Sequence, residues 1–324
     1  MNLDEAIDMI KECLTQDFNV EVNFSEYKPC GEKPLNLIAI DGSATFIFNV
    51  STLWLGIIRV CALEYEFENG YYLRDRREEE YVEIISTHKA LNDIQDKLLR
   101  NFPFATPNFI INELRRLYEI NLLRKIAEEK KNVIIAMDGA LTTTFLKGLD
   151  EEVKKILEIC KKNENLLIGV AKDSKTHAFH HSITDVELLE RKAKDKDYCY
   201  VELPESFIKR CKPPLYGKAY FARLFPKARW FRIDIANEAP PKLVFSQLSC
   251  YARSKLSLGY VYPLVEAHKL AIKVNQLREI YEERFKEEAL RKGIPLHEIL
   301  RGITNAEGRS YGAYHTYLDE ISEW

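Results

Sequence analysis

The stretches IAIDGS, residues 38–43, and IAMDGAL, residues 135–141, share one pattern: apolar residues lead directly into an aspartate that is followed by glycine. A strand that ends in this way presents a carboxylate to a cleft while glycine lets the backbone turn away. Asp-Gly is also a common turn dipeptide, so a single copy would indicate only a turn. Two copies, at Asp41 and Asp138, predict two strand ends that share a metal site.

The apolar runs before these aspartates indicate strands that are covered on both faces. Residues 37–40 and 133–137 are continuously apolar, which is typical of strands inside α/β sheets. The chain after Asp138 continues in a helix-like pattern and does not return as a hairpin. An acid at the carboxyl end of such a strand lies where α/β sheets place their active sites. We therefore expect both aspartates to belong to a functional site.

Hydrophobic periodicity and turn residues predict the order of strands and helices along the chain. Strands are expected at residues 37–41, 44–50, 55–67, 71–74, 133–138 and 166–171, and shorter extended runs at 198–202, 218–225 and 229–235. Helices are expected within 1–27, across the charged stretch 78–131 with its main helix at about 108–130, and at 150–162, 184–193, 242–254 and 264–289. The dipeptide Asn69-Gly70 predicts a hairpin between two of the strands.

Three antiparallel strands followed by parallel strands with helices between them resemble the ribonuclease H-like arrangement. The predicted class is therefore α/β: a ribonuclease H-like core whose mixed sheet, an antiparallel meander and then parallel strands, is flanked by helices, with additional C-terminal helices. Composition alone does not separate this fold from other α/β folds. We expect a single domain over residues 1–324, with an N-terminal helix and connector at 1–35, the core at 36–289 and a tail at 290–324.

The composition is that of a soluble globular protein with a sizeable core, since 46% of the 324 residues are hydrophobic and 30% are charged. The formal net charge of -3 neither supports nor excludes an anionic partner, because one basic groove suffices. Seven cysteines without paired spacing, and no signal-like start, predict reduced thiols in a cytoplasmic protein. No apolar run approaches the roughly 20 residues of a membrane helix.

The helix expected before the second aspartate offers a third acid. Glu113 and Glu119 are six residues apart, so they lie about 120° away from a common face. The apolar stripe of the helix places Glu119 at its edge, from which a carboxylate can reach a site. The alternative is a solvated helix face on which Glu119 pairs with Arg115. Three converging acids would supply oxygen ligands for Mg²⁺ or Mn²⁺, which can activate water for attack on a phosphodiester.

Three further residues are candidates for catalysis. Lys172 follows the predicted strand 166–171, where its ammonium group can hold a scissile phosphate or orient the attacking water. Pro263 suits the first turn of a helix, which places His268 slightly over one turn inside that helix, as a metal ligand or general acid. Tyr260 can form a hydrogen bond with a phosphate or a ligand carboxylate. The simpler alternatives are a solvated lysine, a core histidine and a packed tyrosine.

Six motifs, taken in order, resemble those of the NurA family, nucleases of archaea and some bacteria that process DNA ends. They are IAIDGS at 38–43, RRLYE at 115–119, IIAMDGAL at 134–141, GVAKDSK at 169–175, FRIDI at 231–235 and GYVYPLVEAHKLA at 259–271. The order of these motifs over roughly residues 36–275 is more specific than any one of them. Val261 departs from the family, which has proline there in a Tyr-Pro-Tyr-Pro string.

The resemblance implies a ribonuclease H-like core and a homodimer with a central DNA channel. It also implies Mn²⁺-dependent 5′ to 3′ exonuclease activity, with Mg²⁺ as a possible substitute, and endonuclease activity on single strands. The implied partner is a HerA-type hexameric ATPase, working beside the break-recognition nuclease and its coiled-coil ATPase in the resection of double-strand breaks. A protein with these partners acts on DNA ends and has no membrane partner.

Carried over to this sequence, the acids of the family fall on Asp41, Glu119 and Asp138, and Tyr260 and His268 complete the site. Glu113 is the alternative for the third acid. The expected metal ligands are Asp41, Glu119, Asp138 and His268, and the expected catalytic residues are these four together with Lys172 and Tyr260. Two other functions stay open at this point: a non-catalytic DNA clamp for an ATPase, and a ribonuclease H-like nuclease that acts on RNA.

Overall fold

The computed structural model describes residues 2–15, 18–31, 33–50, 53–68, 70–84, 106–142, 149–193, 195–236, 238–254 and 257–294. Its strands are β1 (Ser25–Glu26), β2 (Leu37–Val50), β3 (Leu53–Phe67), β4 (Tyr71–Ile84), β5 (Ile134–Asp138), β6 (Leu166–Ala171), β7 (Cys199–Glu202), β8 (Lys218–Arg223) and β9 (Phe231–Ile235). Its helices are α1 (Leu3–Thr15), α3 (Pro107–Glu129), α4 (Leu149–Lys162), α5 (Asp185–Lys192), α6 (Glu205–Ile208), α7 (Pro241–Tyr251), α8 (Tyr262–Ala271) and α9 (Val274–Arg291).

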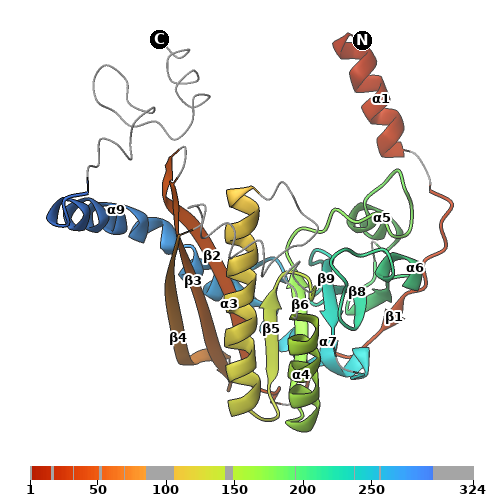
Figure 1. Cartoon of the computed structure of the whole chain (residues 1–324). Coiled ribbons are helices and arrows are strands. Elements are labelled where there is room, and N and C mark those ends of the chain that lie inside the picture. The colour runs from red at the N-terminus through yellow and green to blue at the C-terminus, as the bar shows by residue number, and fades with distance from the viewer. Residues whose placement is uncertain are drawn as a thin grey trace.

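The described strands form one mixed sheet in the order β1-β7-β8-β9-β6-β5-β2-β3-β4 (Figure 1). Strands β2, β3 and β4 are an antiparallel meander, and β5 and β6 continue the sheet parallel to β2. This confirms the α/β class and the ribonuclease H-like order of the core. The sheet extends further on the other side, where β9, β8, β7 and β1 are each antiparallel to their neighbours.

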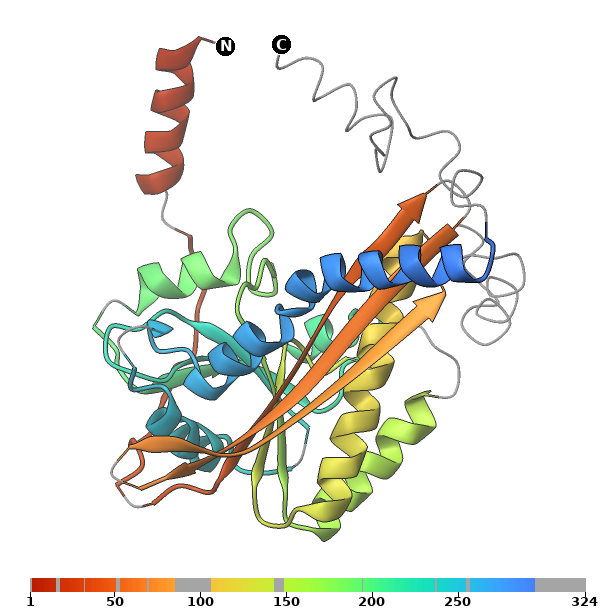
Figure 2. The same cartoon turned by 90° about the vertical axis from the view of Figure 1, so that its left-hand side faces the viewer.

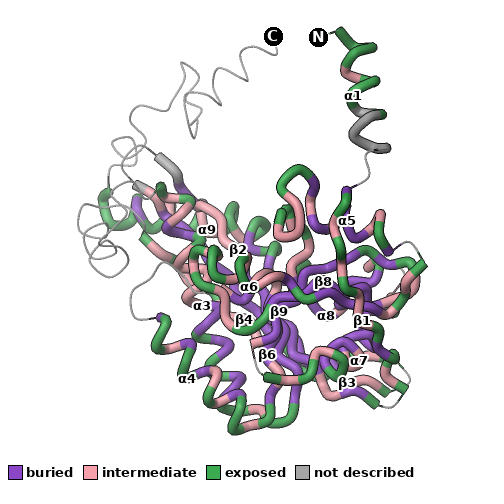
Figure 3. Tube along the Cα trace, turned by 90° about the vertical axis from the view of Figure 1, so that its right-hand side faces the viewer, coloured by how far each residue is buried: buried purple, intermediate pink, exposed green. Residues whose placement is uncertain are grey.

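Helices cover both faces of the sheet (Figures 1 and 2), which is why its central strands are continuously apolar. Successive residues of a strand point to opposite faces. In β2, Leu37 and Ala39 belong to the core under α7 and α8, whereas Ile38 and Ile40 belong to the core under α3 and α4. Buried residues accordingly lie along the middle of the molecule (Figure 3). By the same alternation, the next residue, Asp41, faces α8.

Asp41 lies inside a strand, so the expectation that a strand ends there is wrong. Strand β2 runs on to Val50, and the pairs Asp41↔Cys61 and Gly42↔Val60 continue its ladder with β3. The parallel pairing of β2 with β5, however, stops at Ile40↔Met137. Asp41 therefore lies level with the end of β5, where Asp138 is the last residue and Gly139 turns the chain with φ 106°. The strand end expected at Asp138 is confirmed.

Two further expectations fail for reasons of tertiary structure. Residues 78–84 are strand and not helix, because β4 pairs with β3 along its whole length and its Glu78 and Glu80 bind the buried Arg59 of β3. The helix expected at 264–289 is divided into α8 and α9. Residues 272–273 form a turn between the two helices without proline or glycine, and Val274 begins α9 fully buried against the far half of β2 and β3.

Several local predictions are confirmed. Strands β3 and β4 form the hairpin predicted around Gly70, and α3 begins at Pro107 with the Thr106 side chain accepting a hydrogen bond from Phe109 N. The first helix expected within residues 1–27 is α1, which extends away from the sheet (Figure 1). The part of the tail beyond residue 294 lies outside the described residues. None of the helices in the described ranges has the length and hydropathy needed to cross a membrane.

Candidate metal centre

Three predicted site residues converge beside the end of β5. Asp41, Asp138 and His268 each offer a ligand atom, and these three atoms lie within 4.8 Å of one another. His268 Nδ1 is 2.9 Å from Asp41 Oδ2 and 3.8 Å from Asp138 Oδ2. The aspartates come from adjacent parallel strands, and the histidine comes from α8, which covers that face of β2. The fold therefore brings together side chains that are as much as 227 residues apart.

Burial makes the charged form of the Asp41 carboxylate unfavourable in the absence of a cation. The pKa of Asp41, which is 5% exposed, is raised to about 6, chiefly by burial. The hydrogen bond with His268 opposes that shift, whereas the negative charges of Asp138 and Glu119 add to it. A divalent cation would relieve this repulsion, and two carboxylates with one imidazole are a donor set that suits such an ion. The His268 side chain is 46% exposed, so the cluster is open to a ligand from solvent.

Tyr260 holds one of the two aspartates. It precedes α8, and its hydroxyl lies 2.9 Å from Asp138 Oδ1 and 3.0 Å from Val170 O, so it donates to one of them at a time. Burial raises the pKa of Tyr260 well above its ordinary value, with the charge of Asp138 adding to the shift. The phenol therefore stays protonated and acts as a donor. Val261, which replaces the expected proline, is the N-cap of α8.

Lys172 binds the other carboxylate oxygen of Asp138. It follows β6, as expected, and its ammonium group forms an ion pair with Asp138 Oδ2. About a third of its side chain is exposed. The flexible side chain of Lys172 therefore places a positive charge on the solvent-facing side of the cluster. The structure thus places Lys172, Tyr260 and His268 around the same two carboxylates.

Glu119 lies next to the cluster but binds arginines. Its side chain is 1% exposed, and its two carboxylate oxygens accept from Arg115 and Arg116. It approaches β2 from the α3 side, against Gly42, which has no side chain to block it. Glu113 lies about 9 Å further along the helix axis, so Glu119 is the glutamate of α3 that adjoins Asp41. The predicted pair with Arg115 exists, but on a buried face.

Sequence reasoning did not assign a supporting role to three residues beside this cluster. Arg116 joins Glu119 to the chain after Asp138, Gly42 makes room for Glu119, and Asp234 binds the chain after Asp138 from β9. One signal was present in the sequence: the motif FRIDI places an arginine and an aspartate inside an apolar strand, where buried charges need partners.

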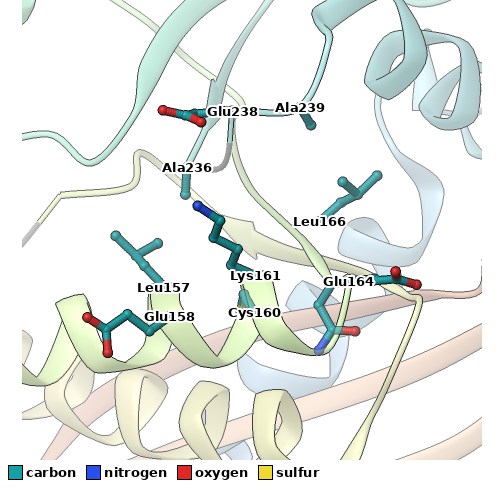
Figure 4. A pocket seen from close by; sticks show the side chains of 10 residues that line it. Leu157, Glu158, Cys160, Lys161, Glu164, Leu166, Ala236, Glu238 and Ala239 are labelled. Atoms are coloured by element: carbon teal, nitrogen blue, oxygen red, sulfur yellow. The ribbon is translucent and has the colours of Figure 1, made fainter.

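A pocket of about 500 Å³ lies away from the cluster (Figure 4). It opens between the C-terminal half of α4 and the residues Ala236, Glu238 and Ala239, and its lining also includes Leu157 and Lys161. It also adjoins Leu166, the first residue of β6, whereas Lys172 follows the last residue of that strand. The pocket is therefore at the opposite end of β6 from the candidate metal centre.

Comparison with known proteins agrees with the motif order. A family model described as the NurA domain matches residues 35–271. This chain belongs to the NurA family. The crystal structure of the NurA nuclease from Sulfolobus solfataricus is similar to it, with 15% sequence identity, a TM-score of 0.52, and coverage of 88% of this chain and 94% of that chain. Membership in the NurA family supports a nuclease role.

Other solved structures match at lower TM-scores. An endonuclease V from Ciona intestinalis, solved with DNA, has 13% sequence identity to this NurA chain and a TM-score of 0.43, with 79% of this chain and 92% of that chain covered. A search of curated proteins finds no match.

Proposed function

We propose that this NurA-family chain is a metal-dependent DNA nuclease. The observation that carries the proposal is the convergence of Asp41, Asp138 and His268, whose ligand atoms lie within 4.8 Å of one another. The reactions proposed are 5′ to 3′ exonuclease activity on single- and double-stranded DNA and endonuclease activity on single strands. The metal proposed is Mn²⁺, with Mg²⁺ as the alternative, on the resemblance to NurA nucleases; the two carboxylates of the cluster suit either ion.

The residues around the cluster have complementary tasks in this proposal. Asp41, Asp138 and His268 would hold the ion, which when bound activates water and stabilises the leaving oxygen. Tyr260 keeps one oxygen of Asp138 fixed by hydrogen bonding and so sets the direction of the other. Lys172, which has a flexible stem, exchanges Asp138 for the scissile phosphate when the nucleic acid arrives, and its charge offsets that of the phosphate.

Glu119 is proposed as a fourth ligand. Its burial beside Asp41 supports this role, since its charge already acts on the pKa of Asp41. Its oxygens now bind Arg115 and Arg116, so direct ligation requires that at least one of these contacts is given up. An alternative within the same function is that Glu119 positions β2 and Asp41 without touching the ion.

The partners are proposed on the resemblance to NurA nucleases. They are DNA ends, a second copy of this chain, and a HerA-type hexameric ATPase acting in the resection of double-strand breaks, with a functional link to the break-recognition nuclease and its coiled-coil ATPase. A cytoplasmic location belongs to the same proposal and is supported by Cys61, Cys160 and Cys199, which are buried and form no disulfide. A pure DNA clamp is disfavoured, because buried carboxylates at the cluster would repel phosphates without aiding binding.

The decisive experiment measures cleavage of end-labelled linear duplex and single-stranded DNA with Mn²⁺, Mg²⁺ or a chelator. Asp41→Asn and Asp138→Asn are expected to abolish metal-dependent cleavage and to leave DNA binding largely intact. Asp75→Asn, on an exposed part of β4, is the matched control and is expected to cleave at the wild-type rate. Cleavage by either site variant at the wild-type rate would contradict the assignment. RNA of the same sequence, cut faster than DNA, would instead favour an RNA nuclease.

A further inference from the structure

The chain immediately after Asp138 is held from several directions. We call residues 139–142 the 139–142 turn. Gly139 N donates to Val170 O of β6 at 2.8 Å, and Leu141 N donates to Asp234 Oδ2 of β9 at 3.0 Å. Arg116 of α3 donates to Ala140 O at 2.7 Å. A turn fixed in this way also fixes the strand end from which the Asp138 side chain extends.

The carboxylate that binds the 139–142 turn is almost completely buried. Asp234 is 1% exposed, and its partner Arg232 is 8% exposed. Arg232 Nε donates to Asp234 Oδ1 at 2.9 Å, and Arg232 Nη2 lies 3.2 Å from Asp234 Oδ2. A buried ion pair is a poor source of stability compared with well-packed apolar residues, because both charges lose their hydration. We therefore expect the pair to have a role other than stabilising the fold. Its contact with the 139–142 turn indicates that this role is to hold the turn in place.

The turn also packs directly on β6. A Cβ atom placed on Gly169 would lie 2.6 Å from Gly139 O and 2.9 Å from Leu141 N, which is too close for any side chain. Gly169 is the residue of β6 that pairs with Asp234 of β9. The turn thus lies over the strand next to the carboxylate that binds it, with no space in which to shift.

Arg116 connects this turn to the third acid. Its Nη1 donates to Glu119 Oε2 at 3.1 Å, while its Nη2 donates to Ala140 O. One planar guanidinium therefore fixes the distance between Glu119 and the chain that follows Asp138. A lysine has one ammonium group in place of the two-pronged donor and cannot hold both partners with the same geometry.

We propose that Asp234 and Arg116 are positioning residues of the metal centre. They hold the 139–142 turn so that the Asp138 carboxylate meets Asp41 and His268, and they act through the turn without touching substrate or metal. This inference rests on the proposed metal-dependent nuclease function. Outer partners of metal ligands typically change metal affinity or activity by about 10- to 100-fold when they are replaced.

The first test is Asp234→Asn, an isosteric change. Both oxygens of Asp234 accept from N–H donors, so the amide nitrogen faces a donor in either place: one contact is lost if it replaces Oδ1, and two, including that with Leu141 N, if it replaces Oδ2. Calorimetric titration with Mn²⁺ alone is expected to show binding weakened about 10- to 100-fold. Arg116→Lys, which removes no buried carboxylate, is the second variant. It is also expected to weaken Mn²⁺ binding. The full chain is used throughout, with melting temperature and single-turnover DNA cleavage measured beside Mn²⁺ affinity.

Glu64→Gln is the control for a general loss of stability. Glu64 of β3 is 5% exposed and pairs with Lys130, so the change also removes a buried carboxylate, but it lies opposite Ile38, which faces α3, and not on the α8 face where Asp41 meets His268. It is expected to lower the melting temperature while Mn²⁺ affinity stays at the wild-type value. The proposal is overturned if Asp234→Asn and Arg116→Lys bind Mn²⁺ like the wild type, or if Glu64→Gln weakens Mn²⁺ binding equally. A wild type that binds Mn²⁺ without cutting DNA would contradict the nuclease function, while the titrations still decide the positioning role.

Discussion

Replacing Gly42 by alanine is expected to disturb the metal centre through a single methyl group. The new Cβ would lie 2.6 Å from Glu119 Oε1, 3.1 Å from Glu119 Cγ and 3.0 Å from Val60 Cγ1. Ordinary contact begins near 3.5 Å, so the carboxylate oxygen must retreat by about 0.9 Å. Glu119 cannot swing into solvent, because it is 1% exposed and bound by Arg115 and Arg116.

Two magnitudes follow from this overlap. Overpacking of a buried site costs about 1–3 kcal/mol, which for a chain of this size lowers the melting temperature by about 1.5–4.5 °C. A displacement near 1 Å at a catalytic group can lower the rate about 100-fold. The measurements are thermal unfolding of the metal-free protein and single-turnover cleavage of single-stranded DNA with Mn²⁺. Gly31→Ala is the control, since a Cβ at Gly31 meets nothing within 4 Å.

A double-mutant cycle tests whether Glu119 is the cause. In a Glu119→Ala background the nearest obstacle is gone, so Gly42→Ala is expected to cost much less stability than in the wild type. An equal cost in both backgrounds would refute the reasoning, because the strain would then come from Val60 or the backbone. Wild-type cleavage by Gly42→Ala would show that the position of Glu119 does not matter for catalysis.

Three other predictions concern the metal centre. Tyr260→Phe removes the hydrogen bond to Asp138 and is expected to weaken Mn²⁺ binding by about tenfold in calorimetry, with little change in melting temperature; unchanged affinity would contradict the role. Because the pKa of Asp41 is raised to about 6, metal must displace a proton below that pH. Mn²⁺ affinity is expected to fall about tenfold per pH unit there, and proton release measured in two buffers checks it. Mn²⁺ at about 100 times its dissociation constant is expected to stabilise the fold by about 2.7 kcal/mol, and a chelator or Asp138→Asn to remove this gain.

The sign of the pH effect differs for the metal-free protein. A buried carboxylate whose pKa is raised favours the protonated form in the folded state, so its contribution to stability is greatest at low pH and is lost as pH rises through about 6. Mn²⁺ reverses this trend, because it binds only the deprotonated carboxylate. Unfolding curves with and without Mn²⁺ are therefore expected to converge as the pH falls below 6.

The sequence predicted the centre of the sheet well, because short continuous apolar runs that end in Asp-Gly are typical of buried strands. The position of Asp138 at the end of β5 was predicted correctly. The closeness of Asp41 to Asp138 was also predicted, although β2 continues beyond Asp41. The break was wrongly expected at Gly42 because glycine after aspartate usually marks a turn. Here the glycine of β2 leaves room for a glutamate of helix α3, and this long-range contact is not contained in any local sequence pattern.

Charged strands and supporting partners escaped prediction for a related reason. The charged residues of β4 favour a helix locally, and only their pairing with Arg59 of β3 makes a strand of them. Asp234 was visible as an acid in an apolar run, but its partner in the 139–142 turn is 93 residues earlier. Candidate ligands can be predicted from sequence motifs, whereas the contacts that orient these ligands depend on the tertiary structure.

The separation of Asp41 from His268 by 227 residues has a consequence for the synthesis of the protein. A growing chain acquires both aspartates and the parallel strands that carry them long before α8 leaves the ribosome. Until α8 docks on β2, the aspartates lack the histidine, and Tyr260, which fixes Asp138, is also missing. The complete ligand set therefore exists only in a finished core, so the proposed nuclease is not assembled from a partly made or clipped chain.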